Sequence, residues 1–233
     1  MAKVYLFFPF NDYMKDGATA GLQSFLEQQD PSLRFEVIVR GTGLMGSRVL
    51  ARIADDDLLM CMAHGDIEKP SELYLCTSEG TTVMTANDLA GLLETSGLPK
   101  THQSVLILNC WAGGDSTLAQ GAVQGAGPGG TKGQTSPGSV VVTKNGYGQC
   151  LASVVAKALG GRSYRSILVG GFPGTVTSSY TLGGMGFYAG TTRVLAQIDH
   201  IQWYDCLGQN TSGGPTVGKV VPRRTLIGTH RGN

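Results

Sequence analysis

The chain carries little charge. Only 15% of its 233 residues are charged, and the formal net charge is +1 at pH 7. A protein that binds nucleic acid or an anionic membrane electrostatically presents an excess of lysine and arginine. The near-neutral balance therefore excludes nucleic acid and anionic membranes as partners attracted by the overall charge of the chain.

Long apolar runs are also missing. No stretch of about 18 apolar residues occurs, which excludes a membrane-spanning helix. The apolar run at 4–10 is short, contains Pro9, and lacks a small-residue cleavage site before Asn11. A secretory signal has a longer apolar core and such a site. We therefore interpret this run as the first strand of a core and expect no signal peptide.

The cysteines form neither a disulfide framework nor a metal-binding motif. There are five of them, an odd number, and they are scattered along the chain. This pattern indicates a reducing compartment, so we expect the cytoplasm or a host cytosol into which the protein is delivered. No Cys-x-x-Cys or His-x-x-x-His spacing occurs, and we predict no metal and no other cofactor.

Glycine, by contrast, is abundant, with 35 residues. Residues 112–148 consist mainly of glycine, serine, threonine and glutamine, a composition that buries little apolar surface and predicts a flexible loop. The length of the chain suits a single domain, which we assign to residues 1–207. Residues 208–233 are predicted to form a polar C-terminal tail.

Apolar strand patterns alternate with helix patterns along most of the chain. The strands are predicted at 4–10, 34–40, 58–63, 104–109 and 166–172, with a hairpin formed by 72–76 and 81–85. The helices are predicted at 15–29, 44–54, 87–95, 149–159 and 189–200. This order predicts an α/β fold, a three-layer sandwich whose central sheet is mainly parallel and has helices on both faces.

Two reactive side chains follow neighbouring strand patterns. His64 comes directly after the apolar run 58–63, and Cys110 directly after 104–109. Parallel strands bring their carboxyl ends to one edge of a sheet, so the imidazole and the thiol are expected to meet there. This is the pair that a cysteine nucleophile needs. Gly65 after the histidine lets a substrate carbonyl approach the backbone closely.

The remaining histidines and cysteines have weaker contexts. His102 precedes the strand pattern at 104–109, so it is expected at the opposite edge of the sheet from Cys110. Cys61 and Cys76 fall inside strand patterns and are predicted to be ordinary core residues. The turn after Cys110 contains two glycines, and its backbone N–H groups can act as oxyanion donors.

Four pieces of sequence occur in a fixed order between residues 58 and 114. They are an apolar block ending in Ala63-His64-Gly65-Asp66, a hairpin with a polar turn from Leu73 to Met84, a helix opening Asn87-Asp88-Leu89-Ala90, and a second apolar block ending in Asn109-Cys110-Trp111-Ala112-Gly113. In this order and spacing they resemble the core of the caspase-like cysteine peptidases, which include caspases, metacaspases, legumains, gingipains, separases and self-cleaving toxin domains.

The resemblance implies a caspase-like fold and a cysteine endopeptidase that cleaves a peptide or protein substrate through a catalytic dyad. Cys110 would be the nucleophile, and His64 the general acid–base that protonates the leaving amine. The backbone N–H groups of Gly65 and Cys110 would hold the oxyanion. The segment 112–148 occupies the place of an activation or processing loop, where self-cleavage is a further expectation.

The residues of the substrate pocket depart from those of caspases. Caspases hold aspartate with arginines after the first strand and after the strand that follows the nucleophile, yet neither 9–12 nor 171–180 contains arginine. Aspartate specificity is therefore not expected. Asp12 or Asp115 favours a basic residue instead, although each is equally consistent with a surface carboxylate. The candidate substrate-binding residues are Asp12, Asp115, Thr177, Ser178 and Ser179.

Two alternatives stand beside the peptidase hypothesis. Residues 41–46, Gly-Thr-Gly-Leu-Met-Gly, match the dinucleotide fingerprint G-x-G-x-x-G between a predicted strand and a predicted helix. Against nucleotide binding, the acidic residue expected after the next strand is replaced by His64. The second alternative is a caspase-like scaffold without activity, against which the presence of both His64 and Cys110 argues.

Overall fold

The fold is taken from a computed structural model of the chain, and the parts that it describes include every strand of one central sheet. The described residues are 3–10, 35–40, 48–66, 69–77, 80–110, 112–114, 150–172, 174–179, 184–189, 192–195 and 201–211. Outside them lie the helix predicted at 15–29, the segment 41–46, all of the predicted loop beyond residue 114 up to 148, and the tail beyond 211.

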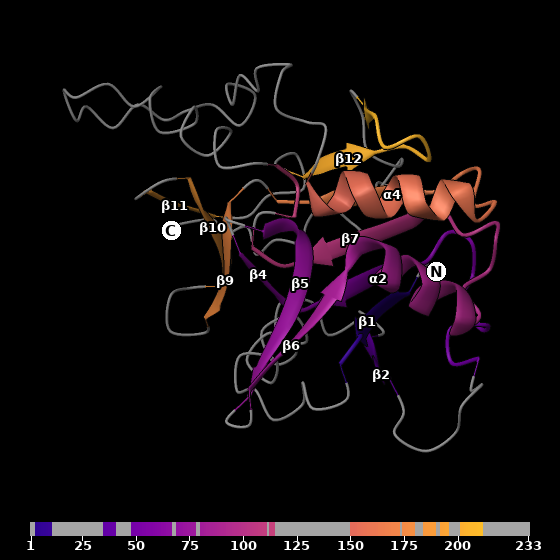
Figure 1. The fold of residues 1–233 in the computed structure, drawn as a ribbon, viewed down its shortest axis with the longest axis horizontal. Coiled ribbons are helices and arrows are strands. Elements are labelled where there is room, and N and C mark those ends of the chain that lie inside the picture. Colours follow the sequence, from indigo (N-terminus) through magenta and orange to yellow (C-terminus); the bar gives the residue numbers. More distant parts are fainter. Residues whose placement is uncertain are drawn as a thin grey trace, which may run out of the picture.

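Seven strands form the central sheet (Figure 1), in the spatial order β13-β12-β8-β7-β3-β1-β2. The strands are β1 (Val4–Phe8), β2 (Phe35–Val39), β3 (Leu58–Met62), β7 (Ser104–Leu108), β8 (Leu168–Gly171), β12 (Gln202–Tyr204) and β13 (Asn210–Thr211). The five strands from β2 to β8 are parallel, whereas β12 and β13 run antiparallel to their neighbours. The predicted α/β class with a mainly parallel sheet is thus confirmed.

The sequence of the central strands explains why they are parallel and internal. Every side chain of β1, β3 and β7 is buried, on both faces of the sheet. Parallel strands that are covered on both faces have nearly continuous apolar sequences rather than alternating ones. The apolar runs that were predicted as strands at 58–63 and 104–109 therefore occupy the middle of the sheet.

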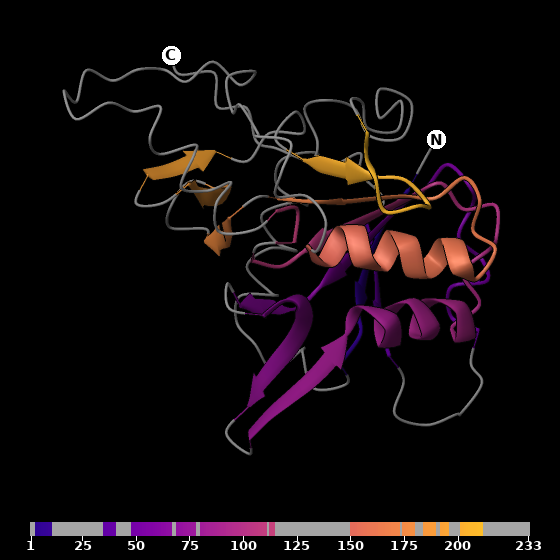
Figure 2. The same cartoon turned by 45° about the horizontal axis from the view of Figure 1, so that its top comes forward.

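Two smaller antiparallel sheets flank the carboxyl ends of these strands. The first contains β4 (His64–Asp66), β5 (Lys69–Thr77) and β6 (Gly80–Thr85), and includes the predicted hairpin, which extends away from the central sheet (Figure 2). The second contains β9 (Thr175–Ser179), β10 (Gly184–Ala189) and β11 (Thr192–Leu195). In Figure 1 the arrowhead of β7 points toward the region of β4, β9 and β10.

Two helices pack against each other beside the sheet (Figure 2), namely α2 (Ala86–Thr95) and α4 (Leu151–Gly161). Helix α2 begins at a capping box, in which the Thr85 hydroxyl accepts the Asp88 N–H and the Asp88 carboxylate accepts the Thr85 N–H. Both helices were predicted to within two residues. None of the helices described is long and apolar enough to cross a membrane.

Two predicted helices are wrong where the structure describes them. Residues 49–52, within the helix predicted at 44–54, form turns, and the Leu50 N–H donates to the Ser96 carbonyl after α2 instead of continuing a helix. The helix predicted at 189–200 gives way to the β10–β11 hairpin, in which Ala189 pairs with Thr192. The β-branched residues Thr192 and Val194 favour such a strand.

Candidate active site

Strands β3 and β7 carry the two candidate catalytic residues to the same edge of the sheet. The strands are adjacent and parallel, and Met62 pairs with Leu108 at their carboxyl ends. The chain leaves β3 through Ala63, whose N–H donates to the Leu108 carbonyl at 3.4 Å. His64 and Cys110 therefore both lie just beyond the end of the β3–β7 ladder.

The backbone of Gly65 touches the residues that follow β7. A Cβ atom on Gly65 would lie 2.2 Å from the Cys110 carbonyl oxygen and 3.0 Å from the Asn109 Nδ2 atom. No side chain fits at these distances, so the two strand ends approach each other only because residue 65 is glycine. Steric contact with the Cys110 peptide thus explains why a glycine follows His64.

His64 is half-buried in β4 and packs against a tyrosine. It pairs with Tyr74 of β5, and the two rings stack with centroids 6.0 Å apart and planes inclined by 29°. The Tyr74 hydroxyl donates to the Gly65 carbonyl at 2.9 Å. Tyr74 therefore fixes both the ring of His64 and the peptide that follows it. Sequence reasoning missed this residue, although its place in the predicted hairpin was a usable signal.

The Cys110 thiol is half-buried and surrounded by backbone groups. Burial raises the pKa of this thiol, and the nearby N–H groups of Val176, Gly65 and Cys110 itself act in the opposite direction. The Sγ–H group donates to the Val176 carbonyl at 3.7 Å. At neutral pH the cysteine is therefore a protonated thiol, placed beside N–H groups that can stabilise negative charge.

The turn after Cys110 is fixed by hydrogen bonds from three directions. The Gly113 N–H donates to Phe172 beyond β8, and the Ala112 carbonyl accepts from Ala152 of α4. The buried Tyr204 hydroxyl of β12 donates to the Gly113 carbonyl at 2.6 Å. The turn after Cys110 is thus held in place by distant parts of the chain. Tyr204 gave no signal in the sequence, because its partner is 91 positions away.

The candidate substrate-binding residues are only partly placed. Thr177, Ser178 and Ser179 belong to β9, which reaches Cys110 through Val176. Their side chains lie outside what the structure describes, and so do Asp12 and Asp115. Among the strands described, β9 pairs only with β10, so one of its edges has no strand partner.

His102 occupies the opposite end of β7, as predicted. Its ring is fully buried, with Nδ1 3.1 Å from the Ala54 carbonyl oxygen and Nε2 2.9 Å from that of Ser104. Burial lowers the pKa of His102, and the two carbonyl oxygens together with Asp57 and Asp55 oppose that effect. The residue is structural and lies far along the sheet from Cys110.

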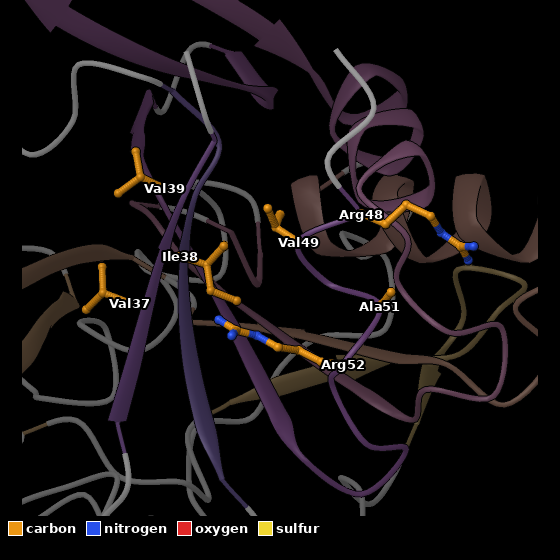
Figure 3. A pocket seen from close by; sticks show the side chains of 7 residues that line it. All are labelled: Val37, Ile38, Val39, Arg48, Val49, Ala51 and Arg52. Atoms are coloured by element: carbon orange, nitrogen blue, oxygen red, sulfur yellow. The ribbon is translucent and has the colours of Figure 1, made fainter. Parts of the chain in front are cut away.

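A cavity of about 550 Å³ opens beside β2, the outermost strand on one side of the sheet (Figure 3). It lies between β2 and the turn at 48–52 and is lined by Val37, Ile38, Val39, Arg48, Val49, Ala51 and Arg52. In Figure 3 the Arg48 side chain points away from β2, while Arg52 extends toward it and forms an ion pair with Glu36. The lining contains no nucleophile or general base.

Within the described residues, no group of three or more His, Cys, Asp or Glu side chains gathers where it could hold a metal ion.

Comparisons with known proteins leave the family open. No protein-family model matches the chain, and no curated protein matches its sequence.

Proposed function

We propose that the protein is a cysteine endopeptidase of the caspase-like type, with Cys110 as nucleophile and His64 as general acid–base. The observation that carries the proposal is the contact of Gly65 with the Cys110 peptide, which joins the His-Gly turn to the cysteine turn. A cysteine nucleophile needs a neighbouring base and a set of oxyanion donors. The two turns together contain a cysteine as nucleophile, a histidine as base, and backbone N–H groups as oxyanion donors.

The fold supports the caspase-like part of the proposal. The candidate dyad follows two neighbouring parallel strands, and the sheet ends in antiparallel strands on the β8 side. Open α/β sheets place their sites beyond the carboxyl ends of parallel strands. A mainly parallel sheet with a histidine and a cysteine after adjacent strands agrees with the arrangement that the sequence resemblance implies.

The raised pKa of Cys110 sets the first step of the mechanism. Because the resting thiol is protonated, His64 takes its proton as Sγ attacks the carbonyl carbon of the scissile peptide. The N–H groups of Gly65 and Cys110 stabilise the resulting oxyanion. His64 then gives the proton to the leaving amine, and a thioester remains on Cys110. Water, deprotonated by His64, hydrolyses the thioester and frees the thiol.

Among the described strands, one edge of β9 has no strand partner, and this edge supports an extended peptide as the substrate. Strands with one unpaired edge bind peptides by adding them as a further strand. The Val176 carbonyl of β9 lies beside the Cys110 thiol, so a peptide bound along β9 would pass the proposed nucleophile.

The glycine-rich residues of 112–148 are the segment of this chain that we propose for self-processing.

The proposal is tested with purified wild type, Cys110→Ala, His64→Ala and Cys206→Ala. Cys206 is half-buried and belongs to no part of the candidate site, which makes it the matched control. We expect wild type and Cys206→Ala to react with thiol-reactive peptide probes and to cleave peptides, and both dyad variants to lose peptide cleavage. Unchanged cleavage by Cys110→Ala or His64→Ala would overturn the proposal and would favour a non-catalytic scaffold.

Mass spectrometry of the same preparations reports self-cleavage. Fragments in wild type that are absent from Cys110→Ala would identify the cut site, and the residue before it would give the preference of the pocket. A basic residue there supports the expectation based on Asp12 and Asp115.

A further inference from the structure

The side chain of Asn109, directly before the proposed nucleophile, is buried and makes no hydrogen bond to the described residues. It is 3% exposed, and neither Nδ2 nor Oδ1 has a partner in the described part of the chain. Folded proteins bond nearly all of their buried amides, and each exception calls for an explanation. An apolar side chain of similar shape would avoid the loss of hydration at no cost in hydrogen bonds.

The unpartnered amide lies against the proposed oxyanion donor. Its Nδ2 and Cγ atoms are 3.0 Å and 3.1 Å from the point where a Cβ on Gly65 would sit, and the Cys110 carbonyl oxygen is 2.2 Å from the same point. The Asn109 amide and the Cys110 carbonyl thus both lie on the side of Gly65 where a side chain would project. A donor and an acceptor lie near each other there without being bonded.

We propose that Asn109 is a positioning residue for acyl transfer, an inference that rests on the proposed peptidase function. When a substrate carbonyl engages the Gly65 N–H, the Asn109 Nδ2–H group donates to the Cys110 carbonyl. This hydrogen bond fixes the Cys110 carbonyl, which lies against Gly65, while negative charge develops on the substrate oxygen. An interaction that forms only as the reaction proceeds accelerates the chemical step.

Ser104 provides a matched control at the other end of β7. Its hydroxyl is the other buried side-chain group without a hydrogen-bond partner in the described residues. Ser104 is the first residue of β7 and Asn109 directly follows its last, so removing either group takes polar atoms without a described partner from one end of this strand. Only Asn109 is near Cys110, so only its removal is expected to affect the reaction.

Two probes of Cys110 separate positioning from packing. Iodoacetamide alkylates a thiol by direct displacement and needs no oxyanion donors, whereas a peptidyl chloromethyl ketone reacts through a tetrahedral adduct that does. Wild type is first tested with ketones that carry lysine, aspartate or leucine next to the reactive group, and the fastest is used. Wild type, Asn109→Leu and Ser104→Ala are then compared for the rate of each probe, with the labelled residue located by mass spectrometry, and for Tm.

We expect the limiting rate of Asn109→Leu with the ketone to fall about tenfold or more, because an oxyanion donor is no longer held in place. Its half-saturating ketone concentration and its iodoacetamide rate should stay within about threefold of wild type, since binding and the thiol are unaffected. Its Tm should equal or exceed that of wild type. Ser104→Ala should share the Tm result and keep both rates.

A ketone rate within about threefold of wild type in Asn109→Leu, or an equal loss with both probes, would overturn the inference. A Tm loss in Asn109→Leu that Ser104→Ala does not share would also overturn it, because the amide would then have a structural partner. If Asn109→Leu does not fold, Asn109→Ala, which cannot overpack the site, is judged by its rates with the same two probes. The proposed function fails separately, if wild type and Cys110→Ala are labelled equally by the ketone.

Discussion

The two ends of β7 differ in how they use buried polar groups. At the amino end, His102 is fully buried and both ring nitrogens face backbone carbonyls. At the carboxyl end, the Asn109 amide is equally hidden but has no partner in the described residues, and Cys110 is only half-buried. Proteins relax their local bonding rules at functional sites more than elsewhere. The amino end contributes stability, whereas the carboxyl end places an amide without a described partner beside Cys110, the nucleophile that we propose.

The largest effect is expected from adding one carbon to Gly65. In Gly65→Ala the new Cβ meets the Cys110 carbonyl oxygen at 2.2 Å, so one of the two turns must move. A displacement of about 1 Å in an active site costs roughly a hundredfold in rate, and we expect a loss of that size in kcat/KM for peptide cleavage.

Gly161→Ala is the matched control for this change. Nothing lies within 4 Å of a Cβ at that position, near the end of α4, so activity should be unchanged and stability should rise by up to about 1 kcal/mol. Wild-type activity in Gly65→Ala would show that the two strand ends are not in functional contact.

Two tyrosine hydroxyls offer a direct comparison of the two edges of the sheet. Tyr204 donates to the Gly113 carbonyl in the turn after Cys110, and Tyr164 donates to the Leu98 carbonyl at 2.9 Å near the amino ends of the strands. Both phenylalanine variants should lose about 1 kcal/mol in the free energy of unfolding. Only Tyr204→Phe should also lower kcat/KM, by about tenfold. Denaturant titration and peptide cleavage measure the two effects, and equal activities would contradict the comparison.

The amino end should show its role in the pH dependence of stability. The pKa of His102 in the folded chain lies below its ordinary value of 6.5 because the ring is buried. As the pH falls below 6.5, His102 binds a proton in the unfolded chain but not yet in the folded chain, so the free energy of unfolding decreases. The slope for one proton does not exceed about 1.4 kcal/mol per pH unit. His102→Gln should flatten this part of the profile, and an unchanged slope would assign it to other groups.

The smallest effect is expected at Tyr74. Tyr74→Phe removes the hydrogen bond to the Gly65 carbonyl but keeps the ring that stacks on His64. Because the bond is only partly buried, we expect kcat/KM to fall by about threefold. Tyr74→Leu also removes the ring, so its kcat/KM should fall further in the same cleavage assay. The reverse order would show that stacking does not orient His64.

Much of this arrangement was accessible from local sequence. Uniformly apolar runs predicted the parallel strands, and residues that directly follow those runs had to lie at one edge, which located His64, Gly65 and Cys110. The 44–54 pattern was misleading because Leu50 and Ile53 are buried in and directly after the turn at 49–52, where the Leu50 N–H donates to the Ser96 carbonyl after α2. Apolar residues at helical spacing therefore belong to no helix among the described residues 48–54.

The residues that support the candidate site could not be predicted from local sequence in the same way. Tyr204, Val176 and Asn109 have ordinary local contexts, and what distinguishes them is a partner, or the lack of one, that only the folded chain defines. Sequence reasoning finds a side chain whose position along a strand limits where it can lie. It does not find one whose role depends on contacts between distant segments.

The raised pKa of Cys110 has a consequence for the lifetime of the protein. Peroxides oxidise the thiolate rather than the thiol, first to a sulfenic acid and then irreversibly. The proposed nucleophile keeps its proton until a base removes it, so it is shielded from this damage between reactions. The burial that raises the pKa of Cys110 should also let the thiol survive peroxide concentrations that would oxidise a preformed thiolate.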